Sequence, residues 1–345
     1  PVRDRAGSST GTPAASTAHA PQAAPPAPTS CTLRQLPLPD GRQMALVTGA
    51  DPSGRYLLGR TYPAHIAGNS MGLHVVIWDR MRPTLVPLPG DDQSLVDINR
   101  AGVAVGNGFG SSSGTVAYYY RAGMVAELPG GTGAEVRAIN DAGTAVGGKG
   151  AKALLWRSVD RAPVELALPA GATYGQAVDI DEDGTVVGNV GTSLTQRRPY
   201  VWAPDGSGHY LPIPPGVPVP TAPAGVKPGA VPGAVAYHIR NGWVIGRVNA
   251  TAVRWNLRTG QAREYPEFAD FADAVNGYGW QIGLGTGGRA LFLSDGSPVL
   301  LPELAKHQPG NLSNLPTTLS DDGTLIGGQS DDSKDVIHAV VWTCS

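Results

Sequence analysis

The acidic run at residues 179–184 (DIDEDG) is the stretch that most resembles a metal-binding loop. Alternating carboxylates can coordinate Ca²⁺, but an EF-hand needs Glu at the twelfth position, where Val190 stands. A second type of calcium loop needs Asp at the ninth position, where Val187 stands. Because the closing ligand is missing in both alignments, the run predicts a hairpin turn and no metal.

Other sequence signals of chemistry are equally sparse. The histidines are scattered singly, and neither H-E-x-x-H nor paired Cys/His spacing occurs, so zinc has no support. The glycine-rich segments 106–110 and 285–288 do not open helices, which argues against a phosphate-binding loop. There is no G-x-S-x-G elbow and no carboxylate pair typical of a glycosidase. We expect no cofactor.

The elements that must position any site follow from composition. The chain has 345 residues with 47 Gly and 31 Pro, which excludes a helical bundle. Hydrophobic residues make up 41%, enough for a packed core, and the net charge of -2 gives no field that would favour nucleic acid. No apolar run is long enough for a membrane span. Residues 1–30 are rich in Ala, Pro, Ser and Thr and predict a disordered linker before a single domain at 31–345.

A short apolar segment that closes on Gly recurs through this domain. The seven copies end at Gly59, Gly106, Gly147, Gly188, Gly246, Gly283 and Gly327. Each follows a turn signal of the kind seen in Asn140-Asp-Ala-Gly143, in which the first side chain caps a type I turn and Gly supplies the positive φ. The sequence therefore predicts seven β-hairpins.

A third strand follows each hairpin, and in five units it ends in Trp. A fourth strand then closes on Leu-Pro or a related pair in six units. The seventh unit lacks its fourth strand because the chain ends at Ser345, while residues 33–39 (LRQLPLP) carry that pattern alone at the other end. Units of about 45 residues, one of them split between the termini, predict an all-β, seven-bladed β-propeller with four-stranded blades. We expect the Trp residues to pack between blades.

The two cysteines fit this closure. Cys344 follows the third strand of the split unit and Cys31 precedes its fourth, where other units have a covalent turn. A Cys31–Cys344 disulfide would replace that turn and stabilise the fold by about 4–5 kcal/mol in the chain-entropy model. Disulfides form in oxidising compartments, so we expect a secreted, extracellular protein.

The repeated unit resembles the HAF repeat of probable extracellular bacterial proteins. The best copies run from Ala138 to Gly147, with Trp156, and from Asp179 to Gly188, with Trp202. The similarity covers about residues 31 to 345. The resemblance implies export and a repeat architecture, and it brings no catalytic positions.

Loop lengths suggest where a partner binds. Turns between first and second strands are tight throughout, whereas second-to-third loops are long in units 1, 2, 4 and 7. Loops on a rigid scaffold often carry function, so we expect these loops to form a recognition surface on one face. The candidate binding residues are Tyr62, His65, Asn69, Phe109, Arg197, Arg198, Asp331, Asp332, Lys334 and Asp335.

Three functions are compatible with these patterns. The first is a secreted binding or scaffold module that recognises an extracellular protein or glycan through the long loops. The second is a propeller lyase or hydrolase with its site at the channel mouth, for which single residues near innermost strands are candidates: Glu135, Arg137, Tyr174 and His238. The third is a structural subunit of a secreted assembly. The sequence favours the first, since it shows no catalytic constellation.

Overall fold

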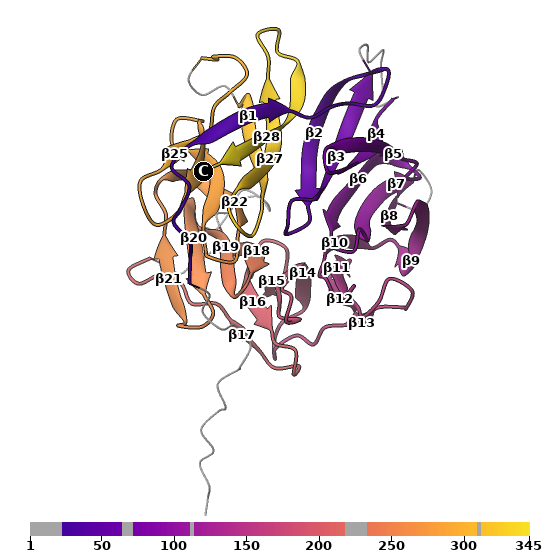
Figure 1. Ribbon diagram of the computed structural model, residues 1–345. Helices are drawn as coiled ribbons and strands as arrows, with labels where there is room; N and C mark the ends of the chain where they lie inside the picture. The colour runs from indigo at the N-terminus through magenta and orange to yellow at the C-terminus, as the bar shows by residue number, and fades with distance from the viewer. Residues whose placement is uncertain (1–22, 64–71, 111–113, 218–232, 309–311) are drawn as a thin grey trace, which may run out of the picture.

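The computed structural model describes residues 23–63, 72–110, 114–217, 233–308 and 312–345. Over these residues it contains seven antiparallel four-stranded sheets and no helix, and the sheets surround a central axis as the blades of a propeller (Figure 1). The predicted fold class is therefore confirmed. No described element is a helix that could cross a membrane.

Strands follow one another from the axis outwards in each of the first six blades. Blades 1 to 3 consist of β2 (Arg42–Ala50), β3 (Tyr56–Pro63), β4 (His74–Asp79) and β5 (Arg82–Val86); β6 (Asp91–Ile98), β7 (Ala104–Gly110), β8 (Gly114–Arg121) and β9 (Met124–Thr132); and β10 (Glu135–Ile139), β11 (Ala145–Lys149), β12 (Lys152–Trp156) and β13 (Val164–Glu165). Blades 4 to 6 consist of β14 (Tyr174–Ile180), β15 (Val186–Gly191), β16 (Arg197–Trp202) and β17 (Gly208–Tyr210); β18 (Val235–Arg240), β19 (Trp243–Val248), β20 (Thr251–Asn256) and β21 (Gln261–Glu264); and β22 (Phe268–Val275), β23 (Gln281–Gly285), β24 (Ala290–Leu293) and β25 (Val299–Leu300).

Blade 7 is built from both ends of the chain. It consists of β26 (Asn314–Leu319), β27 (Leu325–Asp331), β28 (Ile337–Cys344) and, on the outside, β1 (Cys31–Gln35). Cys31 stands opposite Cys344 in the register, and the two form a disulfide across a sequence separation of 313. The closing strand begins at Cys31 and ends at Gln35, earlier than the predicted 33–39, because Pro37 and Pro39 lack the N–H that a ladder needs.

The described chain begins ahead of this strand. Residues 23–30, which the sequence analysis assigned to the linker, are described, and Thr29 and Ser30 donate backbone N–H groups to the carbonyl of Ser345 at 2.8 and 3.1 Å.

Each repeat Trp links its blade to the blade before it. The indole of Trp156 is fully buried and donates to the carbonyl of Pro129, 2.9 Å away, in the Leu-Pro pair of blade 2. Trp78 in blade 1 reaches Pro37, which the N-terminal segment supplies, at 2.7 Å. The same bond joins Trp202 to Ala167, Trp255 to Pro212 and Trp342 to Pro302. The predicted packing role of these residues is confirmed.

Every innermost strand carries a bulge at the same place. The register slips by one residue between Val136 and Ala138 in β10, and the six other innermost strands slip at the equivalent position. The bulge pushes a carbonyl against the neighbouring strand, where the repeated Gly lies. A Cβ on Gly147 would sit 2.0 Å from the carbonyl oxygen of Glu135, and one on Gly188 would sit 2.1 Å from that of Gln176. Close backbone approach therefore requires Gly at these two positions and likewise at Gly59, Gly106 and Gly246. At Gly283 and Gly327 the nearest atoms belong to side chains.

The hairpin turns between first and second strands form as predicted, with Gly143 at φ +78° and Gly184 at φ +88°. Because adjacent strands are antiparallel, these turns and the third-to-fourth turns share one end of the propeller, which we call the turn face. The second-to-third loops and the connections between blades share the other end, which we call the loop face. The loop predicted to be long in unit 2 is shorter, since β7 and β8 extend to Gly110 and Gly114.

Removing the disulfide tests how much of the stability comes from chain closure. The Cys31→Ser/Cys344→Ser variant should have a free energy of unfolding lower by about 4–5 kcal/mol, because the unfolded chain is no longer closed into one loop. Urea denaturation followed by fluorescence measures this change. Treating the wild-type protein with a mild reductant should lower its free energy of unfolding toward that of the variant. Equal free energies of unfolding for the untreated protein, the reduced protein and the variant would contradict the expectation.

Changing one indole tests the link between blades. Trp156→Phe should lower the free energy of unfolding by about 2–4 kcal/mol, since it removes the bond to Pro129 and some buried volume. Tyr120 occupies the Trp position in blade 2, and its hydroxyl has no hydrogen bond within the described chain, so Tyr120→Phe is the matched control. Its effect should stay within about 0.5 kcal/mol. Equal losses in both variants would show that the indole bond adds nothing.

Candidate functional site

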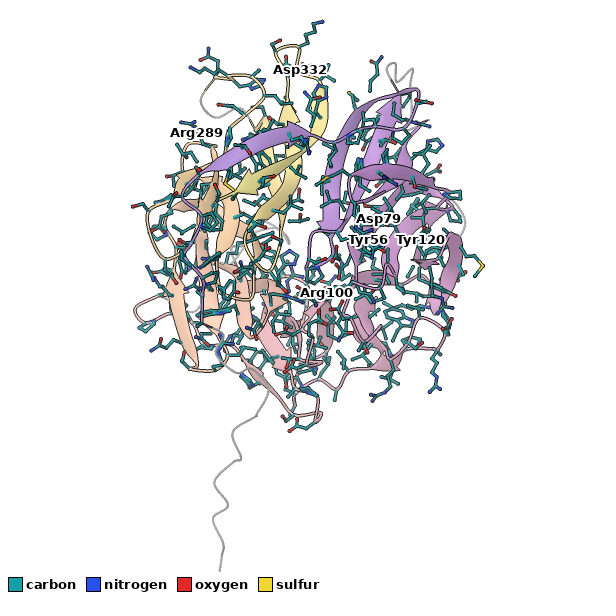
Figure 2. All side chains as sticks on the ribbon, viewed as in Figure 1. Tyr56, Asp79, Arg100, Tyr120, Arg289 and Asp332 are labelled. Atoms are coloured by element: carbon teal, nitrogen blue, oxygen red, sulfur yellow. A yellow bond between two sulfur atoms is a disulfide. The ribbon has the colours of Figure 1, made fainter. Side chains whose placement is uncertain are left out.

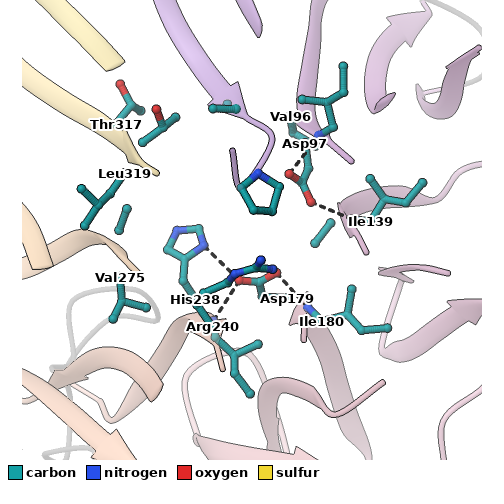
Figure 3. A pocket seen from close by; sticks show the side chains of 18 of the residues that line it. Val96, Asp97, Ile139, Asp179, Ile180, His238, Arg240, Val275, Thr317 and Leu319 are labelled. Atoms are coloured by element: carbon teal, nitrogen blue, oxygen red, sulfur yellow. Dashed lines mark hydrogen bonds and ion pairs between the residues drawn. The ribbon is translucent and has the colours of Figure 1, made fainter. Parts of the chain in front are cut away.

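A cavity of about 160 Å³ lies at the turn-face end of the central channel (Figure 3). It is lined by the last residues of the innermost strands, including Asp97, Asp179, His238, Arg240 and Asp273. These charged side chains come from blades 2, 4, 5 and 6, and blades 3 and 7 add Arg137 and Asp321, so the ring alone brings them together.

Two of these carboxylates hold neighbouring blades together. Asp97 accepts the N–H of Ile98 at 2.9 Å and that of Ile139, in the next blade, at 2.7 Å. Asp179 does the same with Ile180 and Ile239 at 2.8 and 2.9 Å. Burial and then the charge of Asp179 raise the pKa of Asp97 well above its ordinary value, against the two N–H donors. These bonds give both carboxylates a structural role.

Asp273 and His238 also line the channel, but within the described chain neither accepts a backbone N–H group of a neighbouring blade as Asp97 and Asp179 do. Asp273 is the extra residue in the bulge of β22, and burial raises the pKa of its carboxyl group to about 7, opposed by His238. The imidazole Nδ1 of His238 lies 3.3 Å from Oδ2 of Asp179. The carboxyl group of Asp273 therefore changes charge near neutral pH.

Arg240 closes the turn-face end of the channel. Its guanidinium binds Glu182 at 2.6 Å and Asp321 at 2.7 and 2.6 Å, which joins blades 4, 5 and 7. Burial alone would lower the pKa of Arg240, but the bonds to Asp321 and Glu182 raise it. Arg100, near the centre of the ring in Figure 2, binds Asp321 at 2.8 Å. The cations at this end are thus paired with carboxylates.

The structure separates the four residues proposed for the channel mouth. Arg137 and His238 line the cavity, and Glu135 binds Arg137 at 2.5 Å. Tyr174 opens β14 at the loop-face end, opposite Gly191, and does not line the cavity. Asp273 and Asp179 are neighbours of His238. The sequence analysis did not single out Asp273, and it placed Asp179 only in the acidic run. A bulge in every innermost strand leaves no simple periodicity from which to predict them.

The acidic run at 179–184 is a hairpin turn with capping side chains. Oδ1 and Oδ2 of Asp181 accept the backbone N–H groups of Asn241 and Gly242 in the next blade at 2.9 and 2.7 Å. Asp183 accepts the N–H of Thr185 at 2.9 Å. In the described part of the chain, no group of three or more His, Cys, Asp or Glu residues is placed to hold a metal ion.

The residues predicted to form the binding surface lie mostly at strand ends on the loop face. Tyr62 is in β3, Phe109 in β7, Arg197 and Arg198 open β16, and Asp331 ends β27. Asp332, Lys334 and Asp335 lie in the connection from β27 to β28. His65 and Asn69 lie outside the described residues. Blades 7, 1 and 2 are consecutive in the closed ring, whereas Arg197 and Arg198 belong to blade 4.

Two histidines join the acidic loop of blade 7, and the sequence analysis did not predict either contact. His338 Nε2 lies 3.0 Å from Oδ2 of Asp332, and this bond and two backbone N–H donors lower the pKa of Asp332 to about 2. His307 Nε2 lies 3.3 Å from the carbonyl oxygen of Asp332 and 3.7 Å from Asp335. The contact of His307 depends on the course of the connection between blades 6 and 7, which spacing along the chain does not reveal.

A second cavity, of about 250 Å³, opens on the loop face beside this cluster. It lies between the turn that joins β23 to β24 and the connection from blade 6 to blade 7. Arg289, which borders it, and Asp332 both lie toward the upper edge of Figure 2. The other charged or ring-bearing side chains of its lining are Glu303, Lys306 and His307.

Comparisons with known proteins bear on the fold. No protein-family model and no curated protein matches the chain, so membership of the HAF-repeat family is not confirmed. Among solved structures, the chain is similar to a chain of the mitotic checkpoint complex, with TM-score 0.51 and 9% identity over 99% of each chain. It also matches YCF48 from Cyanidioschyzon merolae, with TM-score 0.49 and 10% identity over 90% of this chain and 98% of that chain. The first likeness supports the β-propeller fold alone.

The raised pKa of Asp273 predicts a pH dependence of stability. The pKa is about 7 in the folded state against 3.8 ordinarily, so the folded protein holds the proton that the unfolded chain releases. The free energy of unfolding should therefore fall as pH rises from about 4 to 7, by up to about 4 kcal/mol at about 1.4 kcal/mol per pKa unit. Asp273→Asn should reduce this fall by the part that Asp273 contributes, as measured in urea denaturation series at each pH. The exposed-site control Asp40→Asn should retain the whole fall, and an unchanged slope in Asp273→Asn would refute the assignment.

Proposed function

We propose that this protein is a secreted binding module that recognises an extracellular protein through its loop face. The observation that carries the proposal is the distribution of exposed apolar side chains. Phe109, Leu194 and Leu312 are 52%, 58% and 58% exposed, and all three belong to loop-face connections or the strand ends beside them. Met124 and Val164, 66% and 43% exposed, lie beside turns of the turn face. The remaining exposed apolar residues, Leu85, Tyr210 and Leu300, lie on outermost strands.

Charged side chains surround these apolar residues. Arg197 follows the loop that holds Leu194, and Lys306 lies in the same connection as Leu312. Protein interfaces combine apolar anchors with a polar, charged rim, and the loop face has this composition. The repeat tryptophans, which could otherwise serve as anchors, are buried between blades. A protein partner therefore fits the loop face better than a glycan.

The turn face offers less for recognition. Its hairpin turns are tight, and the cations at its centre, Arg100 and Arg240, are already paired with carboxylates. The carboxylate oxygens of Asp97 and Asp179 accept backbone N–H groups. These structural bonds explain the presence of both residues without a substrate. The geometry therefore supports binding at the loops over catalysis at the channel mouth. The intact disulfide is in keeping with export.

A matched pair of substitutions in blade 2 tests which face binds. Phe109→Ser should reduce the amount of partner captured from culture medium by roughly tenfold, the loss expected for a central apolar anchor. Met124→Ser removes a similarly exposed apolar side chain from the opposite face and should leave capture unchanged. Quantitative mass spectrometry of proteins retained on the immobilised variants is the measurement.

The result can also overturn the proposal. Loss of capture in Met124→Ser but not in Phe109→Ser would place the interface on the turn face. Binding of the wild-type protein to a glycan array, with no protein captured, would show that the partner class is wrong. Circular dichroism of both variants verifies that the sheets are intact.

A further inference from the structure

We propose that the loop-face cavity between blades 6 and 7 binds a free α-amino acid, holding its ammonium group inside and its carboxylate at the rim. The cavity of about 250 Å³ has buried apolar walls at Ala290 and Leu301. Since one water molecule needs only about 10–15 Å³ of such space, the cavity has room for a small organic molecule. This inference does not depend on the binding of a protein partner.

The first polar group inside is Asn314, which is 5% exposed. Its amide nitrogen faces the carbonyl oxygens of Leu301 and Pro302 at 3.3 and 3.4 Å, and this fixes the orientation of the amide. The amide oxygen is left as a buried acceptor, and it has no hydrogen-bond donor in the described part of the chain. A buried acceptor without a donor is unfavourable and calls for a partner.

The second polar group is His307, whose side chain is 9% exposed. Its Nε2 faces the carbonyl oxygen of Asp332, which can only accept, so Nε2 carries the hydrogen. In the neutral ring Nδ1 is then an acceptor, and it too is buried without a donor among the described residues. The neighbouring carboxylate oxygen of Glu303, 4.0 Å away, is another acceptor. The inner part of the cavity thus presents acceptors from three side chains.

The rim has the opposite character. Arg289 and Lys306 are exposed, border the cavity and form no ion pair within the described ranges. A guanidinium and an ammonium group here attract an anion, and the fork of Arg289 suits a carboxylate. An occupant must therefore donate hydrogen bonds inwards and present negative charge outwards.

An α-amino acid meets both demands within one small molecule. Its ammonium group offers three N–H donors to Asn314, His307 and Glu303, and its carboxylate lies one carbon away, toward Arg289 and Lys306. A metal ion fits less well, because the described residues place no group of three His, Cys, Asp or Glu side chains for one. The apolar walls leave space for a small side chain.

Calorimetric titration of the full chain with each of the common L-amino acids tests the site. We expect saturable binding of at least one small amino acid. The tightest binder is then compared with the two analogues that lack its carboxylate or its amine; for L-alanine these are ethylamine and propionate. Each analogue should bind at least roughly tenfold more weakly, as expected for a lost charge-assisted hydrogen bond. Equal binding of either analogue would overturn the assignment of a zwitterion.

Variants locate the binding. Arg289→Gln and Lys306→Gln change exposed side chains, so they should fold, and each should weaken binding by roughly tenfold. Arg157→Gln changes an exposed arginine in blade 3 and is the matched control that should bind as the wild type does. His307→Phe should abolish binding, and its thermal melt shows whether it folds. No binding by a folded wild-type chain, or binding that survives both rim variants, would refute the proposal.

Discussion

The bond from a buried indole to the carbonyl of the preceding blade is the interaction on which this propeller depends. It explains why Trp at the end of a third strand and Leu-Pro after a fourth recur together, since one donates to the other across the gap between blades. Trp78 extends the pattern to the closure, because its acceptor, Pro37, comes from the N-terminal segment. The ring therefore cannot be completed by the C-terminal repeats alone. The Cys31–Cys344 disulfide secures the strand that delivers that acceptor.

A second set of bonds runs around the channel at the turn face. Asn99 donates to the carbonyl of Asn140, and Asn140 donates to that of Asp181, so each turn is tied to the turn of the next blade. Asn276 continues the series to Asp321, whose N–H reaches Pro52 in blade 1. The same Asn or Asp that caps its own turn thus joins neighbouring blades. Because one side chain both caps its turn and bonds the next blade, the hairpins of the turn face must be tight and similar to one another. Connections of different length therefore occur on the loop face.

Much of the fold could be predicted from the sequence because its signals are local. The turn residues, the repeated Gly and the split Leu-Pro segment were enough to predict seven blades and the pairing of the two cysteines, and the structure confirms both. The candidate sites could not be predicted as well, because they join residues from different blades. Asp273 gained its neighbour His238 through a bulge that shifts side chains by one position. His307 reached Asp332 through an irregular connection, whose path no periodic pattern encodes.

The contrast between the two ends indicates how such a scaffold separates stability from recognition. At the turn-face end of the channel, ion pairs such as those of Arg240 occupy the charged groups that meet there. On the loop face, Arg289 and Lys306 have no ion-pair partner in the described parts of the chain, while Asn314 and His307 keep acceptors that no described donor fills. Groups that the fold does not use for itself are available to a ligand. Since no hydrogen bond or ion pair between the described blades uses the side chains of Arg289 or Lys306, these two residues can change without loss of the ring.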